Sequence, residues 1–145
     1  MTTERTDAAS DVFAGISAEP ITIAEVEAFV RASENGAVVS FSGVVRDHDG
    51  GRDVSALEYQ AHPDAERFIA DCCREVAAAT GLRVAAVHRV GTLAIGDTAL
   101  VAAVAAPHRR EAFEACAELV EQIKHRVPIW KRQRFADGVS EWVGL

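Results

Sequence analysis

The strongest constraint on the fold is the stretch 99–105, which is apolar at every position. A strand of this kind has to be covered on both faces, so we expect it in the centre of a sheet. The next segment, from Pro107 to Val127, has apolar residues at helical spacing, and Pro128 ends it because the residue before a proline avoids helical geometry. The inward face of this helix is expected to comprise Phe113, Cys116, Val120, Ile123 and Val127.

The rest of the chain alternates helices and strands in the order αββαββαββ, which predicts one α+β domain. Thr22 and Glu25 form a capping-box pattern for a first helix that Gly36 ends. A second helix is expected to start at 62–64 and to end at Gly81. The other strands are expected over 37–45, 54–60, 82–90, 129–135 and 139–143, with the last two as a hairpin and with 91–97 as a connection.

Length and composition are those of a single globular domain without a membrane span. The chain has 145 residues, of which 49% are apolar and 26% charged, and no apolar run approaches the roughly 20 residues that cross a bilayer. Residues 1–18 lack the apolar core of a secretory signal and are expected to form a flexible tail before a domain over 19–145. The three cysteines are an odd number without metal-ligand spacing, which favours free thiols and a cytoplasmic location.

Charge is unevenly distributed along the chain. The net charge of −7 argues against a general nucleic-acid-binding protein. Residues 108–134 nevertheless hold seven Arg or Lys against four Glu. An acidic protein that gathers cations in one region is a candidate for binding a small anion there.

The first candidate site is the sequence His108-Arg109-Arg110 in the first turn of the long helix. A helix N-terminus carries partial positive charge and favours acidic residues, so three basic residues oppose the local preference. Free backbone N–H groups together with Arg make a good anion site. A solvated surface cluster explains the same residues equally well, so both interpretations stay open.

The second candidate site lies on both sides of Pro128. Lys124 borders the apolar face in the last turn of the helix, from which its amine can point into a cleft or extend to water. In the next strand Ile129, Lys131 and Gln133 share one face, while Trp130, Arg132 and Arg134 share the other. Because the chain changes direction between them, Lys124 and Lys131 could converge on one pocket, where each would lower the pKa of the other.

Arg46 is a third candidate, because it ends a strand just before a glycine-rich loop. Ligand-binding arginines often occupy this position, and solvent-exposed ones do so too. The histidines at 48, 62 and 88 lack metal-ligand spacing and are expected to have ordinary surface or hydrogen-bonding roles. Neither a phosphate-binding glycine loop nor a nucleophile elbow is present in the sequence.

Five segments, in this order and spacing, resemble the MoaE family, the large subunit of molybdopterin synthase. The segments are 36–48, 57–59, 88–91, 107–113 and 123–131, and the resemblance runs from Pro20 to Val143. It implies an α/β hammerhead fold and an enzyme of molybdenum cofactor biosynthesis. It implies that a small ubiquitin-like subunit of the MoaD type supplies sulfur from a C-terminal Gly-Gly thiocarboxylate to cyclic pyranopterin monophosphate, forming the dithiolene of molybdopterin. The implied assembly is a homodimer of large subunits within a heterotetramer.

The resemblance also assigns roles to residues of this chain. It implies that Lys124 and Lys131 are catalytic, and it requires no metal or redox cofactor. The substrate-binding set that it implies is Val44, Val45, Arg46, His108, Arg109, Lys124, Lys131, Arg132 and Gln133. Gln133 stands where the family often has Glu, which argues against an acid–base role there. Chemistry leaves two roles open for Lys124: its ammonium can stabilise an oxyanion, or its neutral amine can act as a base.

One helix separates the two groups of expected site residues. His108 and Lys124 are about 24 Å apart along a straight helix that rises 1.5 Å per residue. We therefore expect a composite site, in which His108 and Arg109 reach across a dimer interface to the lysines of the other subunit. Two alternatives are a docking module without catalysis for a ubiquitin-like protein and an unrelated enzyme acting on a nucleotide or sugar phosphate.

Overall fold

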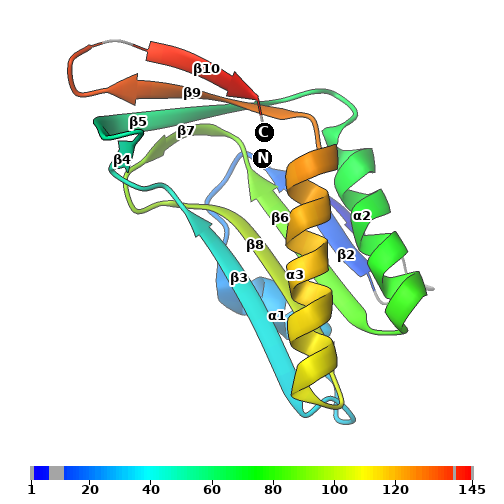
Figure 1. The fold of residues 1–145 in the computed structure, drawn as a ribbon. Helices are drawn as coiled ribbons and strands as arrows, with labels where there is room; N and C mark the ends of the chain where they lie inside the picture. Colours follow the sequence, from blue (N-terminus) through cyan, green and yellow to red (C-terminus); the bar gives the residue numbers. More distant parts are fainter. Residues whose placement is uncertain (1, 7–11, 139, 145) are drawn as a thin grey trace.

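A larger sheet forms the centre of the fold (Figure 1). A computed structural model describes residues 2–6, 12–138 and 140–144. The strand order is β1-β2-β6-β8-β3, in which β2 and β6 are parallel and the other neighbours antiparallel. These strands are β1 (Thr2–Thr6), β2 (Val12–Ser17), β3 (Ala37–Val44), β6 (Arg83–Arg89) and β8 (Thr98–Ala106).

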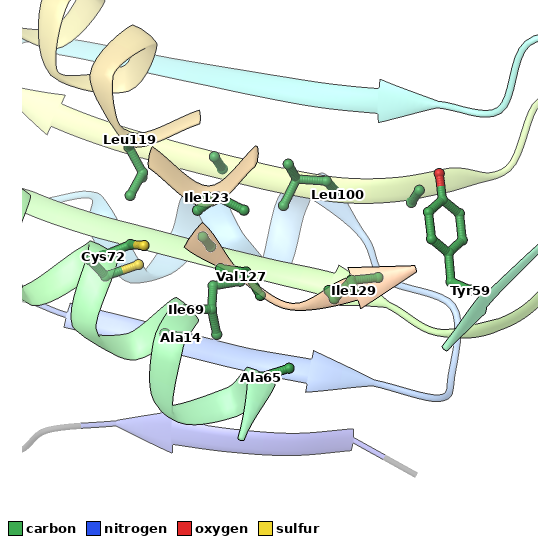
Figure 2. Close-up of a cluster of buried hydrophobic side chains, with 14 of the residues drawn as sticks. Ala14, Tyr59, Ala65, Ile69, Cys72, Leu100, Leu119, Ile123, Val127 and Ile129 are labelled. Atoms are coloured by element: carbon green, nitrogen blue, oxygen red, sulfur yellow. The ribbon is translucent and has the colours of Figure 1, made fainter. Parts of the chain in front are cut away.

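Strand β8 lies between β6 and β3 and is buried from Ala99 to Ala106, as its apolar sequence predicts. Helices α2 (Ala65–Thr80) and α3 (Arg109–Arg126) cover one face of the sheet, and α1 (Ile23–Val30) covers the other. Figure 2 shows side chains of α2 and α3, such as Ile69, Leu119 and Ile123, directed at the strands beneath them. The α+β class is therefore confirmed.

A smaller sheet lies at the C-terminal end of α3 (Figure 1). Its strand order is β10-β9-β5-β4. A further strand, β7, also pairs with β5. The strands are β4 (His48–Asp49), β5 (Arg52–Ala61), β7 (Gly91–Ala94), β9 (Ile129–Phe135) and β10 (Ser140–Gly144). Gly50 and Gly51 connect β4 to β5 with φ of 59° and 79°, a pair of left-handed residues that favours glycine at both positions of a tight hairpin.

Several local predictions need correction. The first helix ends at Val30, with Arg31 as its C-cap, and Gly36 is not its terminus. The expected connection over 91–97 contains β7, because its backbone completes the free edge of β5. The expected hairpin is present, with β9 paired to β10, although Val139 lies outside the described residues. Phe113 does not face inward: 59% of it is exposed.

The flexible tail expected over residues 1–18 does not describe residues 12–17, which form strand β2. Val12 and Ala14 are 2% and 0% exposed, and β2 pairs with β6 along its whole length. The backbone of 2–6 pairs with β2, and residues 7–11 of the expected tail lie outside the described residues. The sequence did not reveal β2 because the strand has only six residues and pairs with β6, which is distant in the chain.

Strand β2 provides a direct test of this correction. We expect Ala14→Glu to lower the free energy of unfolding by several kcal/mol, because it places a carboxylate at a fully buried position without a partner. Urea denaturation followed by circular dichroism measures this change. Ala18→Glu is the matched control, because Ala18 is exposed just beyond the strand. Equal stability of both variants would restore the interpretation of this segment as a flexible tail.

The three cysteines are free thiols, as the sequence predicts. Cys72, Cys73 and Cys116 are free and buried, and burial raises the pKa of each thiol. Within the described part of the chain, no helix has the length and apolar character needed to cross a membrane.

Candidate functional site

Lys124 lies in the last turn of α3, on the edge of the helix face that packs on the sheet. Its neighbours Ile123 and Val127 are 2% and 3% exposed, which fixes the backbone on both sides of it. The Lys124 side chain is half-buried and makes no hydrogen bond or ion pair with any described residue. Burial lowers the pKa of Lys124, and the positive charge of Lys131 lowers it further, while Glu121 opposes both effects.

The turn after α3 directs the next strand back toward the core. The Pro128 carbonyl accepts a hydrogen bond from the His62 backbone N–H at 3.0 Å, which ties the turn to the start of α2. Ile129 is 1% exposed, and strand alternation then places Lys131 and Gln133 on the same inward face of β9. The expected division of this strand into two faces is confirmed by the burial of its residues.

Asp49 joins Arg46 to Gln133. Its carboxylate accepts a hydrogen bond from Gln133 Nε2 at 2.9 Å and forms an ion pair with the Arg46 guanidinium at 3.4 Å. The hydrogen bond from Gln133 is the main reason that the pKa of Asp49 is lowered, and Lys131 and Arg46 add to this effect. These four residues line a pocket of only about 20 Å³.

The position of Arg46 depends on the residue before it. Val45 is 3% exposed, its N–H donates to the Asp97 carbonyl at 2.9 Å, and its own carbonyl accepts from Gly96 N–H at 2.8 Å. Both backbone groups of Val45 are thus occupied within the chain. Val44, by contrast, is 52% exposed at a register shift in β3.

His88 and Tyr59 belong to the same region, although neither was predicted to have a role in the site. His88 is 1% exposed, and its ring contacts the ring of Tyr59 edge-on at 5.1 Å. Tyr59 in turn pairs with Lys131 across β5 and β9. Burial lowers the pKa of His88 to about 4, and the charge of Lys124 contributes to this shift. Its sequence signals were a histidine directly after the apolar residues 84–87 and its place in 88–91, one of the segments that resemble the MoaE family.

Arg132 does not join this group, because it occupies the opposite face of β9. Its guanidinium lies 3.9 Å from a Glu58 carboxylate oxygen, donates to the Ser140 hydroxyl at 3.2 Å, and lies 5.8 Å from the centre of the Trp142 ring. These contacts hold it on the outer side of the small sheet.

His108 and Arg109 also lie apart from the lysines, at the other end of α3 (Figure 1). With Gly36, Ala37 and Phe113 they line an open pocket of about 650 Å³. His108 occupies the N-cap position without a capping hydrogen bond from its side chain. The structure therefore brings Arg46, Lys124, Lys131 and Gln133 together and leaves the two basic residues of the first helical turn elsewhere.

Comparison with known proteins decides the family. Residues 16–126 match the family model described as MoaE protein, which is more than half of the chain. The chain belongs to the MoaE family. A molybdopterin synthase catalytic subunit 1 from Mycobacterium tuberculosis is 44% identical over 130 residues, which cover 87% of this chain and 86% of that relative.

Solved structures agree with the MoaE assignment. A molybdopterin synthase structure from Staphylococcus aureus superposes with a TM-score of 0.84 at 39% identity, covering 90% of this chain and 96% of that one. A complex of subunits 1 and 2 of molybdopterin-converting factor from Helicobacter pylori has a TM-score of 0.71 at 18% identity, covering 90% and 88%, which shows a shared fold. The hammerhead-type fold expected from the MoaE resemblance is confirmed.

The chemistry available at the lysine end of this MoaE protein is that of clustered cations. Among the described residues, no group of three or more His, Cys, Asp or Glu could hold a metal ion. Lys124, Lys131 and Arg46 instead present positive charges. Within the part of the chain that the structure describes, Arg46 forms an ion pair with Asp49 and the two lysines form none. Such a group can bind anions and stabilise negative charge that develops during a reaction.

Proposed function

We propose that this protein is the catalytic subunit of a molybdopterin synthase and that the lysine end of α3 is its active site. The reaction transfers sulfur from the C-terminal thiocarboxylate of a small ubiquitin-like subunit to cyclic pyranopterin monophosphate and forms the dithiolene. The observation that carries the site assignment is Lys124, a half-buried lysine that forms no ion pair with any residue the structure describes and whose pKa is lowered by burial and by the charge of Lys131. A lysine held in this way in a MoaE-family chain is suited to catalysis more than to stability.

The cations match the charges of the reactants. A substrate phosphate and a thiocarboxylate repel each other, and Lys124, Lys131 and Arg46 offset that repulsion and orient both groups. When water attacks the glycine carbonyl carbon, negative charge develops on the carbonyl oxygen, where a lysine ammonium can stabilise it, and the collapse of this adduct breaks the carbon–sulfur bond and leaves the sulfur on the substrate. The lowered pKa of Lys124 also increases the fraction of neutral amine, which can accept a proton from an attacking group.

We also propose that His108 and Arg109 act on the site of a second copy of the chain. About 24 Å of helix separates His108 from Lys124 within one subunit, too far for one small substrate. The pocket beside Lys131 holds only about 20 Å³, whereas the His108 pocket holds about 650 Å³. Phe113, 59% exposed beside His108, is an apolar surface residue suited to a subunit interface.

The proposed assembly is a dimer of this chain with one small subunit at each end. The shared fold with a chain of the two-subunit complex from Helicobacter pylori supports a partner of this kind. A flexible Gly-Gly tail can enter a narrow site because glycine has no side chain to exclude it. Buried free cysteines support the cytoplasmic location expected from the sequence.

Reconstitution tests the proposal. We expect the native protein, mixed with thiocarboxylated small subunit and cyclic pyranopterin monophosphate, to produce molybdopterin, detected as its fluorescent oxidised derivative. The control uses the same small subunit with an ordinary C-terminal carboxylate, which has no sulfur to transfer and should give no product. Binding of the small subunit without any product from the thiocarboxylated form would favour the docking module instead.

A further inference from the structure

His88 is a buried polar residue whose second ring nitrogen has no partner. It lies on the face of β6 that α2 and α3 cover, together with Val84 and Ala86 of the main core. Its Nδ1 is 2.7 Å from the Arg89 carbonyl oxygen. Because a carbonyl oxygen only accepts, Nδ1 carries the proton and Nε2 is left as an acceptor. This Nε2 is buried and has no hydrogen-bond partner within the described residues.

The ring of His88 has little freedom to turn. The Arg89 carbonyl fixes its tautomer, and the ring of Tyr59 packs against it at 5.1 Å with an interplanar angle of 70°. Burial holds the pKa of His88 at about 4, so the ring is neutral near pH 7 and Nε2 remains an acceptor. Buried acceptors without a partner are costly, so a donor is expected to reach this atom in some state of the protein.

Lys124 supplies the matching donor. Its ammonium is half-buried and has no acceptor among the described residues, and its charge acts on His88. We propose that His88 is a positioning residue, whose Nε2 accepts a hydrogen bond from Lys124 Nζ and holds that group in place when the site is occupied. This inference rests on the proposed catalytic role of Lys124.

A neutral acceptor suits this task better than a carboxylate. An acidic partner would cancel the charge of Lys124 and stabilise its protonated form. An imidazole fixes the direction of Nζ and leaves the positive charge available to an anionic substrate. The lack of an ion-pair partner for Lys124 among the described residues and the buried acceptor of His88 are thus two parts of one arrangement.

Two substitutions of similar size separate positioning from packing. In His88→Gln the amide oxygen can take the place of Nε2, whereas in His88→Asn the shorter amide reaches only the place of Nδ1. The measurement is the pH dependence of acylation of Lys124 and Lys131 with the small subunit bound, followed by mass spectrometry of their peptides. A hydrogen bond to the ammonium favours the charged form, so losing it should move the Lys124 midpoint down by about one pH unit in His88→Asn. We expect His88→Gln to retain most of the native midpoint and Lys131 to move less than Lys124.

Turnover provides a second measurement. We expect His88→Asn to lower kcat by about 10- to 100-fold with little change in KM for the small subunit, because a misplaced lysine affects the transition state more than binding. His88→Gln should recover most of this loss. Equal Lys124 midpoints in the native protein and both folded variants would overturn the role of His88, even if native turnover is normal. Absence of native turnover would instead contradict the proposed function, while the Lys124 titration would still test the contact.

Nuclear magnetic resonance of the folded protein gives a test that does not depend on changing His88. We expect the ¹⁵N resonance of His88 Nε2 to move in Lys124→Met, which keeps the length of the side chain and removes the donor. Lys131→Met is the matched control and should move this resonance less. An Nε2 resonance that is unchanged in Lys124→Met, measured with the small subunit bound, would overturn the proposal.

Discussion

Lys124→Ala is expected to reduce kcat for molybdopterin formation by about 10²- to 10⁴-fold, the usual effect of removing a general base or a group that stabilises an oxyanion. The fold should survive, because Lys124 is on the edge of the core and forms no ion pair with the described residues. Burial of its charge, which lowers its pKa, opposes folding, so its removal should leave stability unchanged or raise it slightly. Single-turnover assays and urea denaturation measure the two effects separately.

A neighbouring residue provides the matched control for this variant. His125 is in the same turn of α3 and is exposed, and its Nδ1 lies 2.7 Å from the Glu121 carbonyl oxygen of its own helix. His125→Ala should therefore retain nearly native turnover. Lys124→Arg distinguishes the two chemical roles, because arginine keeps the charge but cannot provide a neutral amine. Normal turnover of Lys124→Ala would contradict a catalytic role and leave Lys124 as a cation that interacts favourably with the C-terminal end of the helix.

The central part of the fold was predictable because local pattern and burial agree there. The apolar run of β8 requires cover on both faces, and the structure provides α3 on one side and α1 on the other. The alternation of β9 likewise predicted that Lys131 and Gln133 share one face and Arg132 the other, and the burial of Gln133 shows that the first of these faces is the inner one. In both strands the pattern of apolar and polar residues within the strand itself is enough to predict which of its faces are buried.

The edges of the fold were not predictable in the same way. Strand β2 is held by parallel pairing with β6, a partner about 70 residues away, and parallel pairs have no turn signal to reveal them. Phe113 fits the spacing of an inward helical residue, but the buried face of α3 is centred on Ala112, Leu119 and Ile123, and Phe113 lies beside it. Spacing alone does not tell which of two neighbouring positions, the small Ala112 or the large Phe113, faces the sheet.

In the candidate site, the residues were predictable from the sequence but their contacts were not. Lys124, Lys131 and Arg46 were singled out from the sequence, because cations at element ends are visible there. The contacts that organise them link distant segments: Gln133 donates to Asp49, 84 positions earlier, and Tyr59 contacts His88. His88 was assigned an ordinary role because one histidine in a strand carries no spacing signal. That its Nε2 is a buried acceptor follows only from the structure, in which Nδ1 bonds to the Arg89 carbonyl and Tyr59 packs against the ring.

Two inactive variants are expected to restore each other if His108 and Arg109 serve the site of the other subunit. In a mixed dimer of Lys124→Ala and Arg109→Ala, one site receives native Lys124 from one chain and native Arg109 from the other, while the second site lacks both. Random pairing of equal amounts should therefore recover about one quarter of the native rate. The reconstitution assay on the co-expressed mixture measures this recovery, and mixed dimers isolated through two affinity tags should reach about one half of the native rate.

The matched control for this experiment pairs Lys124→Ala with Lys131→Ala. Both lysines lie at the same end of α3, where Lys131 acts on Lys124, so every site in that mixed dimer lacks one of them and no recovery is expected. Recovery in the first mixture and not in the second requires His108 and Arg109 to act across the interface between subunits. If neither mixture recovers although mixed dimers form, Arg109 acts within its own chain or away from the site. The 650 Å³ pocket at its end of α3 would then need a different occupant.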